Sequence, residues 1–447
     1  MQSLRFAFNP YNDRSSSFIV HCSLFILSLL ILVGCGGTTP TPVSIPPTPM
    51  PTFASPTAIP TPTRKPPPMI ITLKLWLPEE LNPYARKAGA DTLARQLSDF
   101  RDAYYPDLQV EVTVKKSHGR GGLLDFMRTA RDAAPAILPD LVVLDTADLE
   151  TVTGSGLIQP LDSFLAQSAN GDRFPFATTM SQVEGQTMGT VIGVDMQHLA
   201  YRPALFDAPP LSWQQVISAP APFLFPAGGY DGKINDATLI QYLGAGGKLI
   251  DSEGAPWLDE EAMVRVFDFY SKCITTTVIA PTMVLTITHV DQAWEQFKGG
   301  QAGMTVVRAG RYWLEADEEA VAAPIPTRSG QSISIARGWA LAMVTDDPAR
   351  QDLAMLLFDW LTAPERNAQW TQAAGYLPAT HSVLRLWDVS GEEQTMLRNL
   401  MEAAIPAPRP EVMAATGPIL QEALEQVLKG RATPEEAAAE AIESLED

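Results

Sequence analysis

The chain has 447 residues, 46% of them hydrophobic, and its 51 acidic side chains outnumber the 32 basic ones to give a formal charge of −19. A charge of this sign argues against nucleic acid or an anionic membrane surface as a partner, since both repel an acidic protein. Nine Trp and seventeen Phe residues are enough to fill two hydrophobic cores and still line a groove with aromatic rings.

The amino terminus has the pattern of an exported lipoprotein. The apolar run over residues 18–33 is interrupted by His21 and Cys22 and is too short for a membrane span, so a signal-peptide core fits it better. It ends in Leu32-Val33-Gly34-Cys35, where the small Gly34 suits a signal peptidase and the Cys35 thiol would take a diacylglycerol. We therefore expect a signal peptide over 1–34, lipidation at Cys35 and a protein anchored at the extracytoplasmic face of the cell membrane. The alternative is an ordinary secretory signal or a short anchor helix with an incidental cysteine.

The segment after the predicted lipid anchor, residues 35–69, reads as a spacer. Pro and Thr dominate it, as in Thr39-Pro40-Thr41-Pro42 and Pro66-Pro67-Pro68, so it cannot form a hydrophobic core. Such a composition favours extended polyproline II at about 3.1 Å per residue, which gives a reach on the order of 100 Å. A linker of this kind would hold a folded domain away from the membrane.

The remaining part of the chain, about 380 residues, is longer than one hydrophobic core usually spans, so we expect two lobes. Of the three cysteines, Cys22 leaves with the signal peptide and Cys35 is lipidated, which leaves only Cys273. No intramolecular disulfide is then possible, and Cys273 is expected to be a small buried hydrophobic residue.

The first part of the folded region predicts a parallel β-α-β unit. Leucine and valine alternate with polar residues over 70–77 and 108–116, which is the period of a strand. Between these strands, apolar residues recur at helical spacing over 93–104, so the two strands must be parallel. A further helix over 123–131 leads to the continuous apolar run 141–144, which is typical of a strand buried on both faces.

The rest of the chain alternates helices and strands and becomes mostly helical toward the carboxyl terminus. Asp259 and Asp347 are expected to cap helices, and Thr433-Pro434-Glu435-Glu436 forms a capping box ahead of a last helix. The other predicted elements are helices at 213–219, 236–243, 260–273 and from 291, with strands at 223–225 and 303–307.

The order of these segments resembles the extracellular solute-binding proteins of ATP-driven importers, in the branch that includes maltose-binding and other sugar-binding proteins. The resemblance covers residues 70–445 and rests on six short motifs that occur in the family's order, each of them weak alone. They are Pro139-Asp140-Leu141-Val142 followed by Gly156-Leu157-Ile158-Gln159-Pro160-Leu161-Asp162, Gly246-Gly247-Lys248-Leu249, Trp294-x-x-Phe297-x-x-Gly300-x-Ala302-x-Met304, Gly338-Trp339-Ala340-Leu341-Ala342-Met343, Gly375-Tyr376-Leu377-Pro378, and Leu428-x-Gly430-x-x-Thr433-Pro434-Glu435-Glu436-Ala437.

The resemblance implies an α/β fold of the type II periplasmic-binding-protein kind, with two lobes that are each a mostly parallel sheet flanked by helices. Residues 70–183 and 288–338 would form lobe 1, and residues 184–287 and 339–447 would form lobe 2. A small-molecule ligand would bind between the lobes, which close about a hinge, and a membrane permease of an ABC importer would receive it. We expect a monomer without cofactor or metal.

The resemblance and the strand pattern together suggest two carboxylates for ligand binding. Asp145 directly follows the buried strand 141–144, so its side chain should either emerge into the cleft or cap the next helix. Asp195 matches an acidic ligand contact of the sugar-binding branch, just before Tyr201. Carboxylates suit a sugar because they accept hydrogen bonds from its hydroxyl groups.

Aromatic and basic side chains complete the predicted ligand-binding set. Tyr230 matches a stacking aromatic residue of the branch, Trp313 lies in the loop where the family usually places one, and Trp339 resembles another frequent cleft aromatic. Their flat faces would cover the C–H faces of a sugar. Surface exposure for Tyr230 and a place in the core for Trp339 are the alternatives. The same loop adds Arg308 and Arg311, which can pair with a phosphate or a carboxylate.

The ligand class predicted from these features is a carbohydrate, either a sugar or an oligosaccharide. Two departures weaken a maltodextrin assignment, because Gly417-Pro418 and Leu144 stand where the maltose branch has aromatic residues. An anionic small solute such as a sugar phosphate therefore stays open. So does a receptor that presents its solute to a sensor instead of a permease.

Catalysis is not expected. His118, His198, His289 and His381 are scattered without metal-ligand spacing. Gly154-Ser155-Gly156 lacks the full nucleophile elbow, and residues 119–122 lack the Gly-Lys-Ser/Thr ending of a phosphate loop.

Overall fold

The structure, a computed structural model, describes residues 70–165, 171–315 and 317–446. The predicted signal peptide, the lipidation site Cys35 and the Pro/Thr-rich linker lie outside these residues. Within the described part of the chain, no helix combines the length and the apolar character that a membrane span requires.

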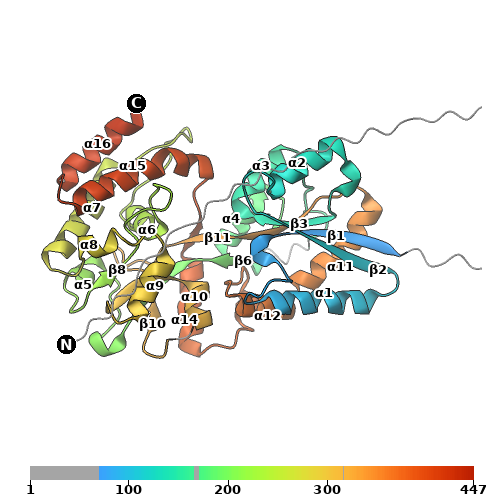
Figure 1. The fold of residues 1–447 in the computed structure, drawn as a ribbon, viewed down its shortest axis with the longest axis horizontal. Helices are drawn as coiled ribbons and strands as arrows, with labels where there is room; N and C mark the ends of the chain where they lie inside the picture. Colours follow the sequence, from blue (N-terminus) through green and yellow to red (C-terminus); the bar gives the residue numbers. More distant parts are fainter. Residues whose placement is uncertain (1–69, 166–170, 316, 447) are drawn as a thin grey trace, which may run out of the picture. The chain divides into compact units, whose positions relative to one another are not determined.

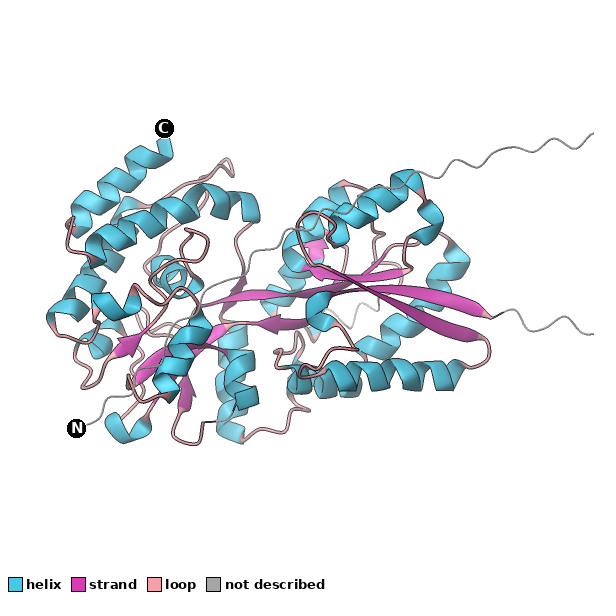
Figure 2. Cartoon of the chain, in the orientation of Figure 1, coloured by secondary structure: helices cyan, strands magenta, loops and turns pink. Residues whose placement is uncertain are grey.

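The strands form two mixed sheets (Figures 1 and 2). The first sheet has the order β12-β11-β3-β1-β2, with β6 paired to β11, and the second has the order β10-β7-β9-β8. A separate hairpin joins β4 to β5. The strands are β1 (Ile71–Pro78), β2 (Leu108–Lys115), β3 (Leu141–Asp145), β4 (Gln182–Val183), β5 (Gln186–Thr187), β6 (Thr190–Asp195), β7 (Gln197–Tyr201), β8 (Phe223–Leu224), β9 (Met304–Arg308), β10 (Val321–Ala323), β11 (Ser334–Met343) and β12 (Ala404–Pro406).

Helices connect and cover the strands. They are α1 (Ala90–Tyr104), α2 (Leu123–Ala133), α3 (Leu149–Gly154), α4 (Pro175–Ser181), α5 (Trp213–Ile217), α6 (Asp236–Gly244), α7 (Glu260–Thr275), α8 (Pro281–Val284), α9 (Val290–Lys298), α10 (Ala309–Glu315), α11 (Pro348–Thr362), α12 (Pro364–Ala374), α13 (His381–Leu384), α14 (Gly391–Glu402), α15 (Pro410–Leu428) and α16 (Pro434–Glu446).

The first sheet confirms the β-α-β unit expected from the sequence. Strands β1 and β2 pair in parallel over their whole length, and α1 connects them. Strand β3, which is parallel to β1, is buried on both faces because helices cover each side of the sheet. One core contains α1, α11 and α12, and the other contains α2 and α3 (Figure 1).

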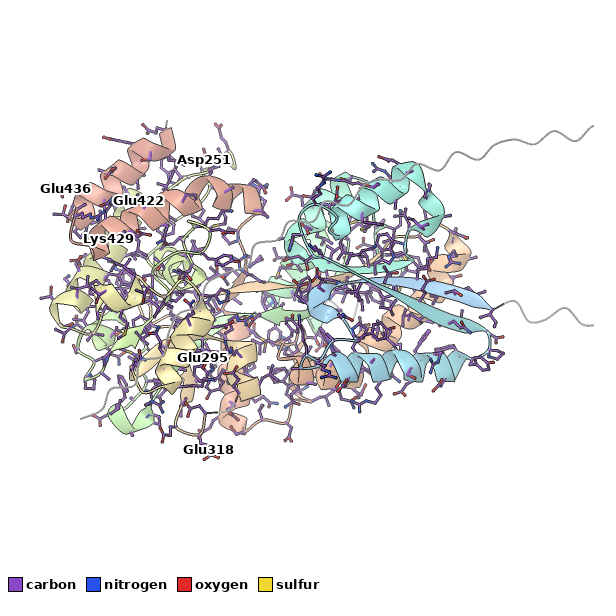
Figure 3. All side chains as sticks on the ribbon, in the orientation of Figure 1. Asp251, Glu295, Glu318, Glu422, Lys429 and Glu436 are labelled. Atoms are coloured by element: carbon purple, nitrogen blue, oxygen red, sulfur yellow. The ribbon has the colours of Figure 1, made fainter. Side chains whose placement is uncertain are left out.

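The second sheet belongs to a separate core formed largely by α5 to α9, α15 and α16. Fully buried rings of α7, including Phe267 and Tyr270, share this core with Trp294 and Phe297 of α9. The last two helices cover the core with their apolar sides. Their charged side chains, such as Glu422 on α15 and Glu436 on α16, lie on the exposed side (Figure 3).

The chain crosses between the two sheets along short connections. Met196 alone separates β6 of the first sheet from β7 of the second. Residues 324–333 join β10 to β11, and residues 407–409 lead from β12 to α15. These crossings place the end of β6 and the start of β11 at the boundary between the sheets.

The packing differs from the segment boundaries expected for the lobes. Residues 288–338 were assigned to lobe 1, but α9, β9 and β10 belong to the second sheet and its core. Residues 339–447 were assigned to lobe 2, but α11 and α12 pack on the first sheet, and only α15 and α16 return to the second core. Residues 184–287 also divide, since β6 is in the first sheet. The apolar period identifies a buried helix face, and it does not specify which of two sheets that face covers.

The expectation of mostly parallel sheets is wrong for the second sheet. Strand β7 pairs antiparallel with both β9 and β10, and only β8 and β9 are parallel. In the first sheet, β11 runs antiparallel to β3 and β6. Strand β11, which enters the first sheet from the second, still pairs in parallel with β12 on its other side.

The predicted helix caps are confirmed. Asp259 accepts a hydrogen bond from Ala262 N at 2.8 Å, and Asp347 accepts one from Ala349 N at 3.0 Å. Thr433 and Glu436 form the complete capping box, with Thr433 Oγ1 accepting from Glu436 N at 3.2 Å and Glu436 Oε2 accepting from Thr433 N at 2.9 Å. These side chains fix where each helix begins.

A buried ion pair joins β3 to α11 and yields a stability prediction. Asp140 accepts from Arg350 Nε and Nη2, both at 2.6 Å, and from Lys74 N at 2.8 Å, and its side chain is only 5% exposed. Asp140→Asn should leave Arg350 partly buried without its counter-charge. We expect the free energy of unfolding to fall by about 2–4 kcal/mol, measured by chemical denaturation.

The matched control is Asp102→Asn, because Asp102 pairs with Arg101 at the surface, where their side chains are 69% and 53% exposed. Its loss should be below about 0.5 kcal/mol. Equal losses for the two variants would contradict the importance of the Asp140 pair.

Candidate functional site

Polar side chains gather at the carboxyl ends of the parallel strands of the first sheet. After β1, Glu80 accepts a hydrogen bond from Ser117 Oγ, which follows β2. His118 Nε2 lies 3.6 Å from Asp145 Oδ2 and 3.5 Å from Asp148 Oδ2, both beyond or at the end of β3. Strand ends of this kind collect loops with free polar groups, which makes this edge suitable for a ligand.

Asp145 has the capping role that was one of its two predicted alternatives. Its Oδ1 accepts from Ala147 N at 2.9 Å and so caps the short helix over 146–148. Its side chain also lines a cavity at the sheet edge. Burial raises the pKa of neighbouring Asp148, while His118 acts to lower it.

Two ion pairs of opposite orientation lie side by side where the chain crosses between the sheets. Asp195 on β6 and Arg337 on β11 are directly opposite each other in the antiparallel ladder. Asp195 Oδ2 lies 3.4 Å from Nη1 of Arg308, which ends β9 of the second sheet. Arg337 donates from Nε and Nη2 to Asp236 at the start of α6, at 2.9 and 2.7 Å. Each crossing strand therefore carries a charge that is paired with a residue of the second lobe.

The environment of Asp195 shifts its ionisation. Burial raises the pKa of Asp195 to about 6, although Arg308 and hydrogen bonds from Gly310 N and Met196 N favour the ionised form. Those hydrogen bonds measure 3.5 and 2.9 Å. A carboxyl group whose pKa is raised toward physiological pH responds to any new partner that changes its surroundings.

Asp291 fixes the orientation of Arg308. It accepts from Arg308 Nε at 3.0 Å and from Nη2 at 2.9 Å, which is a bidentate pair. Arg311, also predicted as a ligand residue, instead contacts Asp291 at 3.5 Å and pairs with Glu295 and Glu315. Arg308 therefore lies beside the crossing, whereas Arg311 contacts Asp291, the partner of Arg308.

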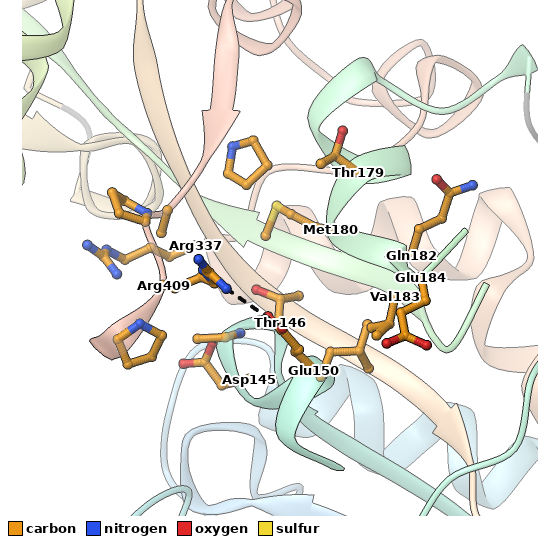
Figure 4. Close-up of a pocket in the computed structure, with 16 residues that line it drawn as sticks. Asp145, Thr146, Glu150, Thr179, Met180, Gln182, Val183, Glu184, Arg337 and Arg409 are labelled. Carbon is orange, nitrogen blue, oxygen red and sulfur yellow. Dashed lines mark hydrogen bonds and ion pairs between the residues drawn. The ribbon is translucent and has the colours of Figure 1, made fainter. Parts of the chain in front are cut away.

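Two cavities adjoin these ion pairs. One of about 290 Å³ is lined by Asp145, Glu150, Arg337 and Arg409 together with Met180 and the segment 406–410 (Figure 4). Arg409 lies 3.8 Å from Glu150, so this contact joins the segment before α15 to α3 of the first lobe.

The other cavity, also of about 290 Å³, contains Arg308, Tyr376, Glu80, Asn82 and Lys87. Burial raises the pKa of the Tyr376 hydroxyl, against the hydrogen bond from Trp339. The charges of Asp195, Glu80 and Arg308 also act on this hydroxyl, which places it among the polar groups of the site.

The predicted aromatic residues are not brought together. Tyr230 is 61% exposed and meets His289 edge-on at a centroid distance of 5.7 Å, so its ring is available. Trp339 is 8% exposed and belongs to a core of the first sheet. Trp313 packs against Tyr312 and His198, and its indole nitrogen is buried without a hydrogen-bond partner in the described part of the chain.

Sequence reasoning missed Arg337, Asp236 and Tyr376 as site residues. Arg337 directly precedes the Gly338-Trp339 motif, and Tyr376 is itself part of the quoted motif 375–378. The signal that could have identified Arg337 is its place inside an otherwise apolar strand, because a charge there needs an oppositely charged or polar partner. The partner, Asp236, is 101 residues away and has no sequence signal of its own.

Glycines let the backbones at this boundary touch. A Cβ at Gly338 would lie 2.6 Å from Gly193 O, and a Cβ at Gly310 would lie 1.7 Å from Gly375 O. A side chain at Gly338 cannot be added without moving the strands that carry Asp195 and Arg337, and one at Gly310 cannot be added without separating α10 from the end of α12.

This arrangement defines a two-lobed binding protein of the periplasmic-binding-protein type. No group of three or more His, Cys, Asp or Glu side chains within the described residues is arranged to hold a metal ion. The bacterial extracellular solute-binding protein family matches residues 100–395, more than half of the chain, and the protein belongs to this family. Membership confirms the expectation of a solute-binding protein rather than an enzyme.

Solved structures agree with this fold. The cyclic alpha-maltosyl-1,6-maltose binding protein from Arthrobacter globiformis has a TM-score of 0.67 at 16% identity, covering 84% of this chain and 98% of that one. Maltose-bound MalE3 of T. maritima has a TM-score of 0.64 at 19% identity, covering 84% and 99%. The sugar-binding protein MalE from Xanthomonas citri has a TM-score of 0.65 at 18% identity, covering 84% and 98%. They confirm the predicted α/β periplasmic-binding-protein fold.

Asp195 should make stability depend on pH in a defined direction. Its pKa is about 6 in the folded protein against 3.8 ordinarily, so the folded state holds its proton more tightly. The stability that this provides is fully present below the lower pKa and is lost as the pH rises through the higher one. In Asp195→Asn this contribution is absent. Between about pH 4 and pH 7 the wild type should therefore lose about 2–3 kcal/mol of unfolding free energy relative to the variant. The difference, variant minus wild type, rises by that amount.

Urea denaturation at a series of pH values measures this difference, and the other carboxylates cancel because both proteins share them. A difference that stays flat or falls over that interval would refute the assignment of a raised pKa to Asp195.

Proposed function

We propose that this protein is a lipid-anchored extracellular receptor of an ABC importer, which binds a carbohydrate between its two lobes and delivers it to the membrane permease. Cys35 would carry the lipid, and the linker 35–69 would give the binding domain its reach. A ligand that contacts both lobes stabilises the closed arrangement by its higher affinity for that state.

The observation that carries this proposal is the pair of reversed ion pairs at the crossing. Asp195 and Arg337 offer an acceptor and a donor on adjacent strands, and Arg308 and Asp236 bring the opposite charges from the second lobe. A sugar hydroxyl donates one hydrogen bond and accepts others, so it can bridge such groups. Charged partners make these hydrogen bonds strong.

The solved structures with this fold support the carbohydrate assignment by analogy. Their names describe binding of cyclic alpha-maltosyl-1,6-maltose, maltose or sugar. Tyr230 adds an exposed ring of the kind that covers a sugar face.

A second candidate ligand is an anionic solute such as a sugar phosphate. The cavity with Arg308 is also lined by Lys87 and by the amino terminus of α1. The cap residue of this helix is Gly89, which has no side chain to accept from the first backbone N–H groups. Glu80 in the same cavity and the carboxylates that pair with Arg308 oppose an anion. The neutral carbohydrate is therefore the better supported ligand.

Carbohydrate binding should be visible in the protein's own tryptophan emission. We expect at least one member of a panel of monosaccharides, oligosaccharides and sugar phosphates to change the emission in a saturable manner and to raise the melting temperature. No response to any carbohydrate, together with a response to a peptide or a metal ion, would contradict the proposal.

Variants of the predicted site test its location. Asp195→Ala and Tyr230→Ala should each weaken the affinity for the responding sugar by about tenfold while the protein stays folded. Matched controls are Asp102→Ala and Tyr105→Ala, whose side chains are also charged or aromatic and lie in the surface pair with Arg101 or exposed at the end of α1. Unchanged affinity in both site variants would remove Asp195 and Tyr230 from the site.

The proposed anchor has its own test. Cys35→Ser removes the thiol that would be lipidated, so the protein should shift from the membrane fraction to the soluble fraction and keep its ligand affinity. Immunoblotting of fractionated cells measures the shift. Retention of the variant at the membrane would contradict the lipid anchor, and loss of affinity in the released protein would mean that the linker is more than a tether.

A further inference from the structure

The exposed Tyr230 belongs to a tight turn between β8 and α6. Tyr230 N donates to Lys233 O at 3.1 Å, and Lys233 N donates to Tyr230 O at 3.0 Å. The two residues between them, Asp231 and Gly232, have φ values of 51° and 69°. Positive φ at both central positions is the pattern of a type I′ turn, which an Asp-Gly pair favours. Tyr230 therefore begins a turn of defined shape, and it is 61% exposed there.

Helix α15 holds the chain on both sides of this turn. Before the turn, Ala227 O accepts a hydrogen bond from Gln421 Nε2 at 2.9 Å. After the turn, Ile234 N donates to Gly417 O at 3.1 Å. Gln421 and Gly417 are four residues apart, so they lie on the same face of the helix. One face of α15 thus contacts both ends of the segment that carries Tyr230.

The amide of Gln421 fits this place in one orientation. The residue is 3% exposed, and its Nε2 also donates to Glu425 Oε1 at 3.0 Å. Both amide hydrogens therefore have acceptors, and a reversed amide would set its oxygen against those two acceptors. In the observed orientation, Gln421 Oε1 is buried and has no hydrogen-bond partner within the described residues. An unpaired buried oxygen costs free energy, so it is the two donated hydrogen bonds that this side chain adds.

The residue just before Tyr230 packs directly on Gln421. A Cβ at Gly229 would lie 2.6 Å from Gln421 Cδ, and the φ of Gly229 is 67°. Glycine adopts this conformation without strain and leaves room for the amide. The position of the Gln421 side chain consequently sets the path of the backbone that leads into the turn.

Backbone groups hold the same segment from its other side. Ala227 N donates to Val284 O at 3.1 Å, and Gly228 N donates to Ile287 O at 2.9 Å. These contacts survive any substitution of a side chain, whereas the contact with Gln421 does not. The role of Gln421 can therefore be tested separately.

Resting on the proposed carbohydrate function, we propose that Gln421 is a positioning residue for ligand recognition. Its amide holds the backbone over 227–229 so that the turn presents the Tyr230 ring to the solute in a fixed orientation. A ring that is already ordered loses less conformational freedom on binding than a ring on a mobile loop. Gly417-Pro418 stands where the maltose branch has an aromatic residue, so this helix supports a ring on a neighbouring turn instead of supplying one.

Hydrogen exchange tests the positioning role without any ligand. Gln421→Met keeps the approximate length and volume of the side chain and removes both donors. We expect backbone amides over 228–236 in the full mature chain to exchange about tenfold faster in this variant, because local opening becomes easier. The matched control is Gln426→Met on the same helix, whose side chain bonds to Glu422, and it should leave exchange over 228–236 unchanged. Unchanged exchange in Gln421→Met would overturn the positioning role.

A second variant keeps this test available if Gln421→Met does not fold. Gly229→Ala displaces the same contact from the backbone side and should also speed exchange over 228–236. Exchange as slow as in the wild type would contradict the contact between Gly229 and Gln421.

A double-mutant cycle tests whether Gln421 acts through Tyr230. Isothermal titration would use those of glucose, galactose, maltose and maltotriose that bind the wild type. Gln421→Met should weaken their affinity by about fivefold or more when Tyr230 is present, and by less than about twofold in the Tyr230→Ala background. An equal loss in both backgrounds would show a general effect on the fold and overturn action through Tyr230.

The outcomes separate this inference from the function on which it rests. If a sugar bound the wild type and Gln421→Met equally well, the positioning role in recognition would fail and carbohydrate binding would stand. If none of the four sugars bound the wild type, the carbohydrate proposal would fail for this panel, and the positioning role in recognition would fail with it. Faster exchange in Gln421→Met would then still show that Gln421 holds the turn.

Discussion

Two ion pairs of opposite polarity, at adjacent positions of a β ladder, join the crossing strands to the second lobe. Asp195 and Arg337 lie opposite each other on β6 and β11, and their partners Arg308 and Asp236 come from β9 and α6 of the other lobe. Each pair joins one acidic to one basic side chain, so the four charges sum to zero although the whole chain carries −19. Partial exposure limits what such pairs add to stability, so their main effect is to define where each lobe meets the crossing strands.

Asp195 lies at a crossing between the lobes and is also a residue of the proposed ligand site. Met196 is the one residue between β6 and β7, so Asp195 lies directly at a crossing. A ligand that changes the partners of Asp195 therefore acts on the segment about which the lobes would move. Burial raises the pKa of Asp195 to about 6, although the charge of Arg308 acts to lower it. A hydroxyl group that donates to Asp195 would therefore compete with a proton as well as with Arg308. Under the proposed function, binding and closure would be coupled through these contacts without a relay between distant residues.

Local features of the fold were predictable from the sequence, and the partners across the fold were not. Alternation gave the strands β1 and β2, the apolar run gave β3, and Asp259, Asp347 and Thr433 marked helix starts, because these signals arise within a few residues of the chain. The lobe to which α9 or α11 belongs depends on contacts far along the chain, and both helices were assigned to the wrong lobe. Asp195 and Arg308, which pair at the crossing, were named from the sequence, but Arg337 and Asp236 were not, because their pairing joins residues 101 positions apart. Trp313 and Trp339 occupy positions where the family resemblance suggests ligand-binding rings, but both pack against cores. A position in a sequence motif does not specify which way a ring points.

The glycines at the boundary have a consequence for how this receptor can diversify. Gly338 and Gly310 approach the backbones of Gly193 and Gly375 so closely that no larger residue fits at either position. The backbone at the boundary is thereby fixed, while Asp145 and Lys87, which line the two cavities, and the exposed Tyr230 are separate side chains that can be exchanged one at a time. Replacing those side chains leaves the glycine contacts unchanged, so a lineage of such proteins can vary its surface at this boundary on a constant backbone.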